Sequence, residues 1–556
     1  MNKKVCSFPI LFALLALLIG TCAVVFPASA QAAPTSTGSI TVSGTVASSY
    51  DAYQIFSANV VDGDSDAKIA TDLAWASDAV RDAALPVLHS AGMPNSQTTA
   101  QEATEWLNTD SHLTSALSAQ LARSLQSSGA VSVALNAGTA AELPCGYWLI
   151  VADDDAIAQG EAGTAPIMAL VGGSAVTVKP KAATPKVSKH VLEDSTAAWQ
   201  KAADATVADD LYWRLSATVP AGLTAYDTYT VRFVDTMGAG LDPSKVAASM
   251  RVYAAAGADG GFDAVQTGKD GRAGIEPAKG WTDITAQCAT KVATDGKTFT
   301  VRTGDLIAAL GGADAFTAGA RVVAVYNAPL NSACNHGIAK GNPNEVYLRY
   351  PRSPFADQSG DAGFTRTPSD DACAYTWDLA LTKRGSDSDK PLAGAVLSIA
   401  DDRGRTLAAD GTWDAEGKAT VTTGEDGRVT VSGVDSGKLE VRELKAPKGY
   451  TAFEGTRSVT VKAEGLDVDQ VAAAKPKLTI TAESPLRADS ADGSTGSLEA
   501  SLINTPTGTP PSITTGGFMP STGDMAMYAA AAAAVAGAAL IVVALLVKRG
   551  GGSHKE

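Results

Sequence analysis

Histidine, cysteine and aromatic residues are scarce in this chain, whose 556 residues include five histidines, six cysteines and 6% aromatics. The histidines are scattered, with no HExxH pattern and no close metal-ligand spacing. Neither a GxSxG nucleophile turn nor a phosphate-binding loop occurs. We therefore expect neither an enzyme nor a metal or other cofactor.

Basic residues are also in deficit, with 44 Lys and Arg against 59 Asp and Glu and a formal net charge of −15. A surface of this sign repels phosphate backbones, which excludes nucleic acid as a partner.

Long apolar runs occur only near the two ends. Two lysines precede the run 5–26, and an Ala-Ser-Ala sequence ending at Ala30 follows it. This pattern is typical of a secretory signal peptide, cut after Ala30 or Ala32. The second run, 525–547, rises about 1.5 Å per residue as a helix and would cross a bilayer of about 30 Å. The basic residues after it predict a cytoplasmic tail.

Two cysteines leave with the signal peptide. An exported chain can oxidise the remaining four, so we expect at least one disulfide, with the pairing open and free buried thiols as the alternative. These four are Cys145, Cys288, Cys334 and Cys373.

Alternation of apolar and polar residues predicts a mainly β chain. A capping box at Thr99–Glu102 and a leucine stripe from Leu113 to Leu125 predict helices inserted in the first domain. Short strands with regular turns favour tandem immunoglobulin-like sandwiches for the next two domains. The expected order is a signal peptide (1–30), an N-terminal domain (31–183), a middle domain (184–354), a polar linker (353–371), a third domain (372–504), a stalk with a short motif (505–523), and a transmembrane segment with its tail (524–556).

The motif before the second apolar run resembles the LPXTG sorting signal of Gram-positive surface proteins, with Met in place of Leu. The resemblance implies that a sortase cysteine attacks the Thr522 carbonyl and passes the Thr522 acyl group to an amine. The motif residues are Met519, Pro520, Ser521, Thr522 and Gly523.

A second motif, from Leu439 to Tyr450, resembles the E-box (YxLxETxAPxGY) of collagen-adhesin B-type domains in Gram-positive pilins. Its Glu, Ala-Pro and Gly-Tyr match, whereas the first Tyr, the Leu and the Thr are replaced. The resemblance implies an amide bond between Lys383 and Asn504, assisted by Glu443. Burial would favour a neutral, nucleophilic lysine and a protonated acid that polarises the Asn carbonyl.

A similar triad is expected in the middle domain. Lys189 lies on its first predicted strand, and Asp235 follows an alternating strand. Asn344, at the start of the last predicted strand, is the expected acceptor, with Asn342 as the alternative.

The segment between the first two domains resembles the pilin motif, whose usual core is YPK, with Lys in place of Tyr. The resemblance implies that Lys181 accepts the Thr acyl group of the next subunit; Lys179 and Lys186 are rival acceptors. Pro180 keeps the segment extended and the amine presentable.

Taken together, these motifs identify a resemblance to sortase-assembled backbone pilins of Gram-positive bacteria. It implies a secreted fimbrial subunit anchored in the cell wall and used in adhesion. The implied partners are a pilus-specific and a housekeeping sortase, other pilin subunits including tip and basal pilins, peptidoglycan and a host ligand. The alternatives are a singly anchored adhesin or basal pilin, and a wall-anchored enzyme.

Overall fold

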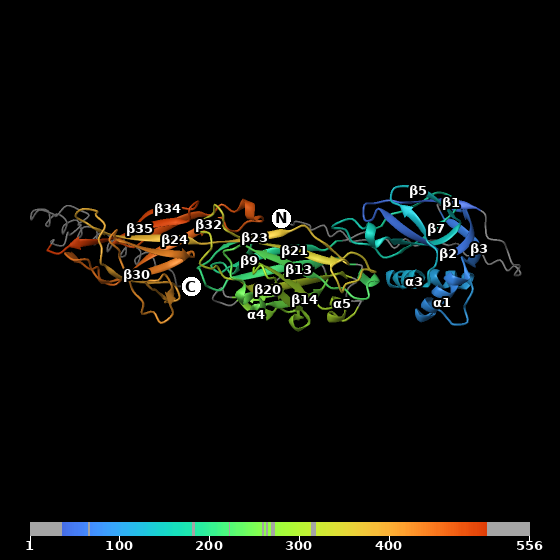
Figure 1. Ribbon diagram of the computed structural model, residues 1–556, viewed down its shortest axis with the longest axis horizontal. Helices are drawn as coiled ribbons and strands as arrows, with labels where there is room; N and C mark the ends of the chain where they lie inside the picture. Colours follow the sequence, from blue (N-terminus) through green and yellow to red (C-terminus); the bar gives the residue numbers. More distant parts are fainter. Residues whose placement is uncertain are drawn as a thin grey trace, which may run out of the picture.

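The computed structural model describes residues 36–508, except 65–66, 110, 181–183, 222, 258–260, 263–264, 268–272 and 313–317. The predicted signal peptide, Lys181, the Met519–Gly523 motif and the second apolar run therefore lie outside the described residues. Figure 1 shows three β-rich modules in a row, coloured blue to cyan, green to yellow, and orange to red. The prediction of a mainly β chain built of tandem domains is confirmed.

The N-terminal module combines a five-stranded sheet, a three-stranded sheet and three helices. The larger sheet has the order β3-β2-β6-β7, with β4 paired to β2, and the smaller has the order β5-β1-β8. Its elements are β1 (Thr37–Val42), β2 (Ser49–Asp62), β3 (Lys68–Trp75), α1 (Asp78–Ser90), α2 (Ala100–Asn108), α3 (Ser115–Ser128), β4 (Val133–Asn136), β5 (Ala140–Pro144), β6 (Gly146–Ala152), β7 (Ile167–Val171) and β8 (Val176–Val178).

The helices lie between β3 and β4, so the predicted helical insertion is confirmed. The Thr99 side chain accepts from the backbone N–H of Glu102, and Glu102 accepts in return from the backbone N–H of Thr99, which is the predicted capping box. In α3, the residues Leu117, Leu121 and Leu125 are buried against the module's core. Leu113 was expected in the same stripe but is 37% exposed, because α3 begins only after the cap at Thr114.

The middle module is a sandwich of two sheets, ordered β10-β9-β12-β20-β14-β17 and β11-β23-β21-β13-β19-β18, with β22 paired to β21. Trp213, Phe233, Phe299 and Tyr326 are fully buried in its core. Its elements are β9 (Lys186–Glu193), β10 (Ala198–Gln200), β11 (Ala202–Asp204), β12 (Tyr212–Val219), β13 (Arg232–Met237), α4 (Val246–Ser249), β14 (Arg251–Ala256), β15 (Val265–Thr267), β16 (Ala273–Pro277), β17 (Thr282–Asp283), β18 (Ala289–Val292), β19 (Thr298–Arg302), α5 (Leu306–Ala309), β20 (Ala320–Asn327), β21 (Asn342–Pro351), β22 (Phe364–Arg366) and β23 (Asp370–Tyr375).

The predicted linker over 353–371 is wrong, since β22 and β23 both pair antiparallel with β21. The sequence analysis expected the strand that carries Asn344, β21, to be the last of its module. It is not the last, because β22 and β23 follow it in the same sheet. The polar residues that suggested a linker bind polar groups of the sheet: Gln358 accepts from the backbone N–H of Thr230 at 3.0 Å, and Asp361 pairs with Arg349 at 3.1 Å. Their polarity therefore serves hydrogen bonding within the module rather than solvation of a free segment.

The third module packs a sheet ordered β29-β24-β35-β31, with β34 on β35, against one ordered β27-β26-β25-β30-β32-β33, with β28 on β25. Its first strand and its last strand, β24 and β35, are parallel neighbours. The strands are β24 (Trp377–Gly385), β25 (Val396–Ala400), β26 (Thr406–Leu407), β27 (Trp413–Asp414), β28 (Val421–Thr422), β29 (Arg428–Val434), β30 (Gly437–Lys445), β31 (Tyr450–Thr451), β32 (Thr456–Glu464), β33 (Lys477–Ala482), β34 (Leu486–Asp492) and β35 (Ser497–Pro506).

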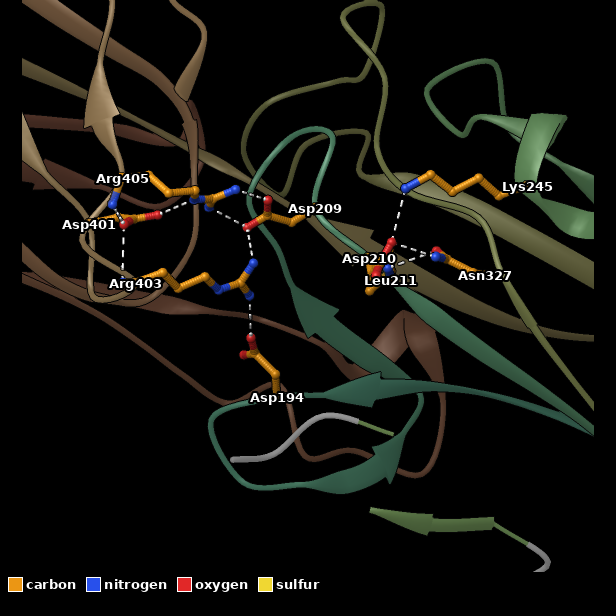
Figure 2. A network of polar contacts seen from close by, with 9 residues as sticks. All are labelled: Asp194, Asp209, Asp210, Leu211, Lys245, Asn327, Asp401, Arg403 and Arg405. Atoms are coloured by element: carbon orange, nitrogen blue, oxygen red, sulfur yellow. Dashed lines mark hydrogen bonds and ion pairs between the residues drawn. The ribbon is translucent and has the colours of Figure 1, made fainter. Parts of the chain in front are cut away.

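The middle and third modules are joined by a network of partly exposed charges (Figure 2). The Asp209 carboxylate of the middle module pairs with Arg405 at 2.7 Å and with Arg403 at 2.8 Å. Beside this network, the indole of Trp377 donates to Asp204 at 2.6 Å. The guanidinium of Arg405 binds both carboxylate oxygens of Asp209, and a bidentate pair of this kind fixes the relative orientation of its two groups as well as their distance. The pair therefore orients the third module relative to the middle module.

The disulfide prediction is wrong, because all four described cysteines are free. Cys145 lies in the core of the N-terminal module, and Cys373 lies in that of the third. Cys334 and Cys288 pack on the core of the middle module. The four thiols thus pack in three separate hydrophobic cores. The prediction rested on export to an oxidising environment, which does not tell which cysteines lie close enough to pair.

Within the described ranges, no helix combines the length and the apolar character needed to cross a membrane.

Candidate functional sites

A buried polar cluster lies between the two sheets of the middle module. Lys189 comes from β9 in one sheet, and Asp235 and Asn344 come from β13 and β21 in the other. All three residues are fully buried. Lys189 Nζ contacts Asp235 Oδ2 directly and lies 2.9 Å from the hydroxyl of Tyr326. The interior of the sandwich thus brings together the lysine, acid and amide predicted for this domain.

Strand register explains why these residues meet. In the antiparallel pair of β13 and β21, Asp235 is opposite Val346 and Met237 is opposite Asn344. Alternate residues of a strand share a face of the sheet. Asn344 therefore points to the same side as Val346 and Asp235, which is the interior.

Burial sets the protonation of the pair. It lowers the pKa of Lys189 to about 8, against the opposing attraction of the Asp235 carboxylate. It also raises the pKa of Asp235, although Lys189 and Tyr326 stabilise the charged form. Both shifts favour a neutral amine next to a neutral acid, which is the state that a nucleophilic attack on an amide needs.

The two asparagines left open by the sequence have different surroundings. The side chain of Asn342 accepts from the backbone N–H of Asn335 at 2.8 Å and donates to its carbonyl at 2.9 Å. It also donates to the carbonyl of Ala374, so it serves the turn before β21. Asn344 instead donates to Tyr326 at 2.8 Å, and its carbonyl Oδ1 has no hydrogen-bond partner among the described residues. Only Asn344 lies in the cluster.

A second buried cluster lies in the third module. Lys383 of β24 is fully buried, and its Nζ lies 3.7 Å from Glu443 Oε1 and 3.1 Å from the carbonyl of Leu502. Asn504 of β35 donates from Nδ2 to both oxygens of Glu443, at 2.9 and 3.0 Å. The parallel register places Leu502 opposite Lys383, so Asn504 lies two residues further along the neighbouring strand. The three residues predicted from the E-box resemblance are therefore in one cluster.

The lysine of this cluster is also shifted. Burial lowers the pKa of Lys383 to about 8, against the attraction of the Glu443 carboxylate. One detail differs from expectation: Glu443 contacts the amide nitrogen of Asn504, while the carbonyl Oδ1 has no partner in the described part of the chain. The acid is placed to move a proton toward the nitrogen that would leave rather than to polarise the carbonyl.

The E-box builds this position locally. Glu443 lies on β30, and its Oε2 also accepts from the backbone N–H of Phe453 at 3.1 Å. After β30 the chain turns at Gly449, whose φ of +86° is a conformation that residues with a side chain adopt only with strain. The next strand, β31, then pairs with β35 through Tyr450 and Thr451. The Pro-Lys-Gly-Tyr sequence thus attaches the end of the E-box to the strand that carries Asn504.

The lysines of the pilin-like motif are only partly described. Lys179 and Lys186 are both exposed, Lys186 at the start of β9 and Lys179 just after β8. Lys181, the predicted acceptor, lies outside the described residues.

Sequence reasoning missed Tyr326, whose hydroxyl contacts all three members of the middle cluster. It also missed Lys201 and Asp370. Asp370 accepts from the backbone N–H of Lys189 at 2.7 Å, and Lys201 donates to the Lys189 carbonyl at 2.9 Å. Tyr326 had one signal, its inward position in the alternating strand 321–326, but no short-range motif connects it to its partners, which lie 18, 91 and 137 positions away.

Comparison with known families defines the class of the third module. Residues 378–475 match the SpaA prealbumin-like fold domain family, which covers most of the sandwich from β24 onward but ends before β35. The chain is thus a mainly β, multi-domain protein that carries a SpaA prealbumin-like domain.

Among individual proteins, the chain is similar to the trypsin-resistant surface T6 protein of Streptococcus pyogenes serotype M6, with 31% identity over 143 residues. The match spans 24% of each chain, so about a quarter of that relative is covered.

Solved structures with similar arrangements include the T6 backbone pilin of Streptococcus pyogenes, with 17% identity, a TM-score of 0.44 and coverage of 85% of this chain and 98% of that one. The full-length major pilin SpaD of Corynebacterium diphtheriae gives 15% identity and a TM-score of 0.40, covering 85% and 98% of the two chains.

Proposed function

We propose that this chain is the structural backbone subunit of a covalently polymerised pilus anchored in the cell wall, and that its middle and third modules each form an internal Lys–Asn amide bond. The observation that carries the proposal is the pair of buried Lys–acid–Asn clusters, one in each of two successive modules. The segment shared with the T6 surface protein supports an extracellular, surface-exposed role.

The proposed reaction needs no added reagent. The neutral Nζ of Lys383 attacks Cγ of Asn504, the Cγ–Nδ2 bond breaks, and ammonia leaves after Nδ2 has received a proton through Glu443. Lys189, Asp235 and Asn344 are the equivalent groups of the middle module. Folding holds the amine against the amide, which supplies the orientation that an enzyme would otherwise provide.

Such bonds suit a fibre one molecule wide, in which tension passes through every module in turn. A domain held by non-covalent forces alone is stable by only about 5–15 kcal/mol. In the third module, a bond between β24 and β35 would join the strand where the chain enters to the strand where it leaves. Force would then pass through the module without unfolding it.

Polymerisation is assigned to the C-terminal motif and to the segment between the first two modules. A pilus-specific sortase would join Thr522 of one subunit to Lys181 of the next, and a housekeeping sortase would attach the finished fibre to peptidoglycan. The fibre would present the chain for adhesion, with tip and basal pilins as further partners. A singly anchored adhesin or basal pilin would share the internal bonds but not the polymer.

The mass of the intact mature protein tests the internal bonds. Each bond removes one ammonia, so the measured mass should lie two ammonia masses below that of the sequence. Peptide mapping should find one loss in the Lys189–Asn344 pair and one in the Lys383–Asn504 pair. A mass equal to the plain sequence would refute both bonds, whatever the fold.

A further inference from the structure

The hydroxyl of Tyr326 lies at the centre of the middle cluster. It accepts from Lys189 Nζ at 2.9 Å and from Asn344 Nδ2 at 2.8 Å, and it donates to Asp235 Oδ2 at 3.0 Å. One proton and two lone pairs are all that a phenol hydroxyl offers, so this group is fully used. The attacking nitrogen, the leaving nitrogen and the acid of the proposed reaction therefore share one hydroxyl.

The third module achieves the same connection without a tyrosine. There the carboxylate of Glu443 contacts the leaving nitrogen of Asn504 directly, at 2.9 and 3.0 Å. In the middle module the acid is an aspartate, one methylene shorter. Asp235 Oδ2 is occupied by Lys189 and Tyr326, and Oδ1 has no hydrogen-bond partner among the described residues. The tyrosine hydroxyl fills the gap between the short acid and the amide.

The position of Tyr326 is well determined by packing. It lies on β20 opposite Trp213 of β12, and both residues are fully buried. Its ring meets that of Phe299 edge-on, with centroids 4.8 Å apart, and Lys189 Nζ lies over the ring at 5.3 Å from its centroid. A fully buried ring in contact with these neighbours keeps its hydroxyl in the cluster.

We propose that Tyr326 is a catalytic residue of the middle module, which carries a proton between Asp235 and the departing nitrogen of Asn344. This inference rests on the proposed bond between Lys189 and Asn344. The third and middle modules would then form the same kind of bond by two proton paths. The path in the third module passes directly through a glutamate, and the path in the middle module passes through an aspartate and a tyrosine.

The step balances as a proton transfer within the cluster. The Tyr326 hydroxyl gives its proton to Nδ2 and takes the proton of the neutral Asp235 carboxyl. Lys189 Nζ forms a bond to Cγ of Asn344 and gives one proton to the carboxylate that Asp235 has become. The Cγ–Nδ2 bond breaks with its electron pair on nitrogen, and ammonia leaves. Tyr326 and Asp235 end in the states in which they began.

The experiment follows bond formation in the mature chain made by cell-free synthesis, sampled from minutes to a day by intact mass and peptide mapping. In the Tyr326→Phe variant, we expect the Lys189–Asn344 bond to form at least about a hundredfold more slowly, the usual contribution of a positioned acid–base group. The Lys383–Asn504 bond should form at the wild-type rate and serves as an internal reference. Tyr350→Phe is the matched control, because it removes a buried hydroxyl that donates to the carbonyl of Gly160 at 2.7 Å, away from the cluster.

A second variant separates chemistry from folding. Asp235→Glu combined with Tyr326→Phe gives the middle module a longer acid that reaches Asn344 without the hydroxyl, and we expect the bond to return. The proposed role of Tyr326 is overturned if folded Tyr326→Phe protein forms the Lys189–Asn344 bond at the wild-type rate. It is also overturned if the folded double variant does not form that bond. If Tyr326→Phe does not fold, the double variant decides. Absence of the middle bond from the wild-type protein would refute the proposed function instead.

Discussion

The amide nitrogen of Asn504 donates to both carboxylate oxygens of Glu443, at 2.9 and 3.0 Å, inside a module whose first and last strands are parallel neighbours. The same acid lies 3.7 Å from Lys383 Nζ. One carboxylate thus connects the amine that would attack with the nitrogen that would leave.

Replacing Glu443 with Ala should therefore prevent the bond in the third module. The intact mass should rise by one ammonia after the side-chain change is allowed for. The free energy of unfolding should fall by about 4–5 kcal/mol, the value that chain-entropy arguments give for a cross-link closing a loop of about 100 residues. Glu440→Ala is the control, because Glu440 lies on the same strand with a half-exposed side chain. An unchanged ammonia loss in Glu443→Ala would contradict the proton path.

The two asparagines of the middle module should respond differently. Asn344→Ala should abolish the ammonia loss that maps to Lys189. Asn342→Ala should keep that loss but destabilise the module by about 1–3 kcal/mol, because the backbone of Asn335 and the carbonyl of buried Ala374 lose their hydrogen-bond partner. Intact mass and denaturant unfolding measure the two effects separately. The reverse pattern would assign the bond to Asn342.

The joint between the middle and third modules should weaken as pH rises. Glu193 lies beside it, since its Oε2 accepts from the backbone N–H of Asp204 at 3.1 Å, and Asp204 accepts from Trp377 of the third module. Burial, with the nearby charge of Asp204, raises the pKa of Glu193 from 4.5 to about 8. A carboxyl with a raised folded-state pKa contributes stability at low pH and loses it as pH rises through about 8. We expect the melting temperature to fall by a few degrees between pH 5 and pH 8, since about 1 kcal/mol shifts it by about 2–4 °C in a module of this size.

Glu193→Gln should flatten this pH dependence and stabilise the joint at pH 8, because the amide copies the uncharged carboxyl. Exposed Glu345→Gln is the control and should leave the slope unchanged. A Glu193→Gln variant that melts with the wild-type pH profile would show that this carboxyl does not titrate in the folded protein.

Polymerisation should depend on Lys181. In the bacterium, Lys181→Arg should remove the high-mass ladder from wall extracts on immunoblots while leaving the monomer on the surface. Lys179→Arg and Lys186→Arg are the matched controls and should keep the ladder. If Lys181→Arg leaves the ladder undiminished, one of the two exposed lysines is the acceptor. Absence of any ladder in the wild type would support a singly anchored protein.

The four cysteines of the mature chain should all be free thiols. Alkylation of unfolded, unreduced protein should label four sites per chain, because the thiols are distributed over three separate cores. The same labelling after reduction is the control. Fewer than four labels before reduction would show a disulfide that the structure does not contain.

The sequence by itself determined the features that depend on near neighbours. Alternation predicted a mainly β chain, and the Thr99–Glu102 spacing predicted a capping box, because both depend on contacts within a few residues. The E-box pattern drew attention to Glu443 together with Lys383 and Asn504, which the fold brings into one cluster.

Tertiary structure alone decided the features that depend on distant strands. Asn342 and Asn344 share the inner face of β21, and the register of β13 on β21 decides which of them reaches the cluster: Asn344 is opposite Met237, two residues from Asp235, whereas Asn342 lies beyond the paired residues and binds the turn at Asn335. The strands β22 and β23 resembled a linker because their polar partners lie far away in the chain. Tyr326 meets Lys189 only because the sandwich closes over them, since the two residues are separated by 137 positions and no local pattern records that contact.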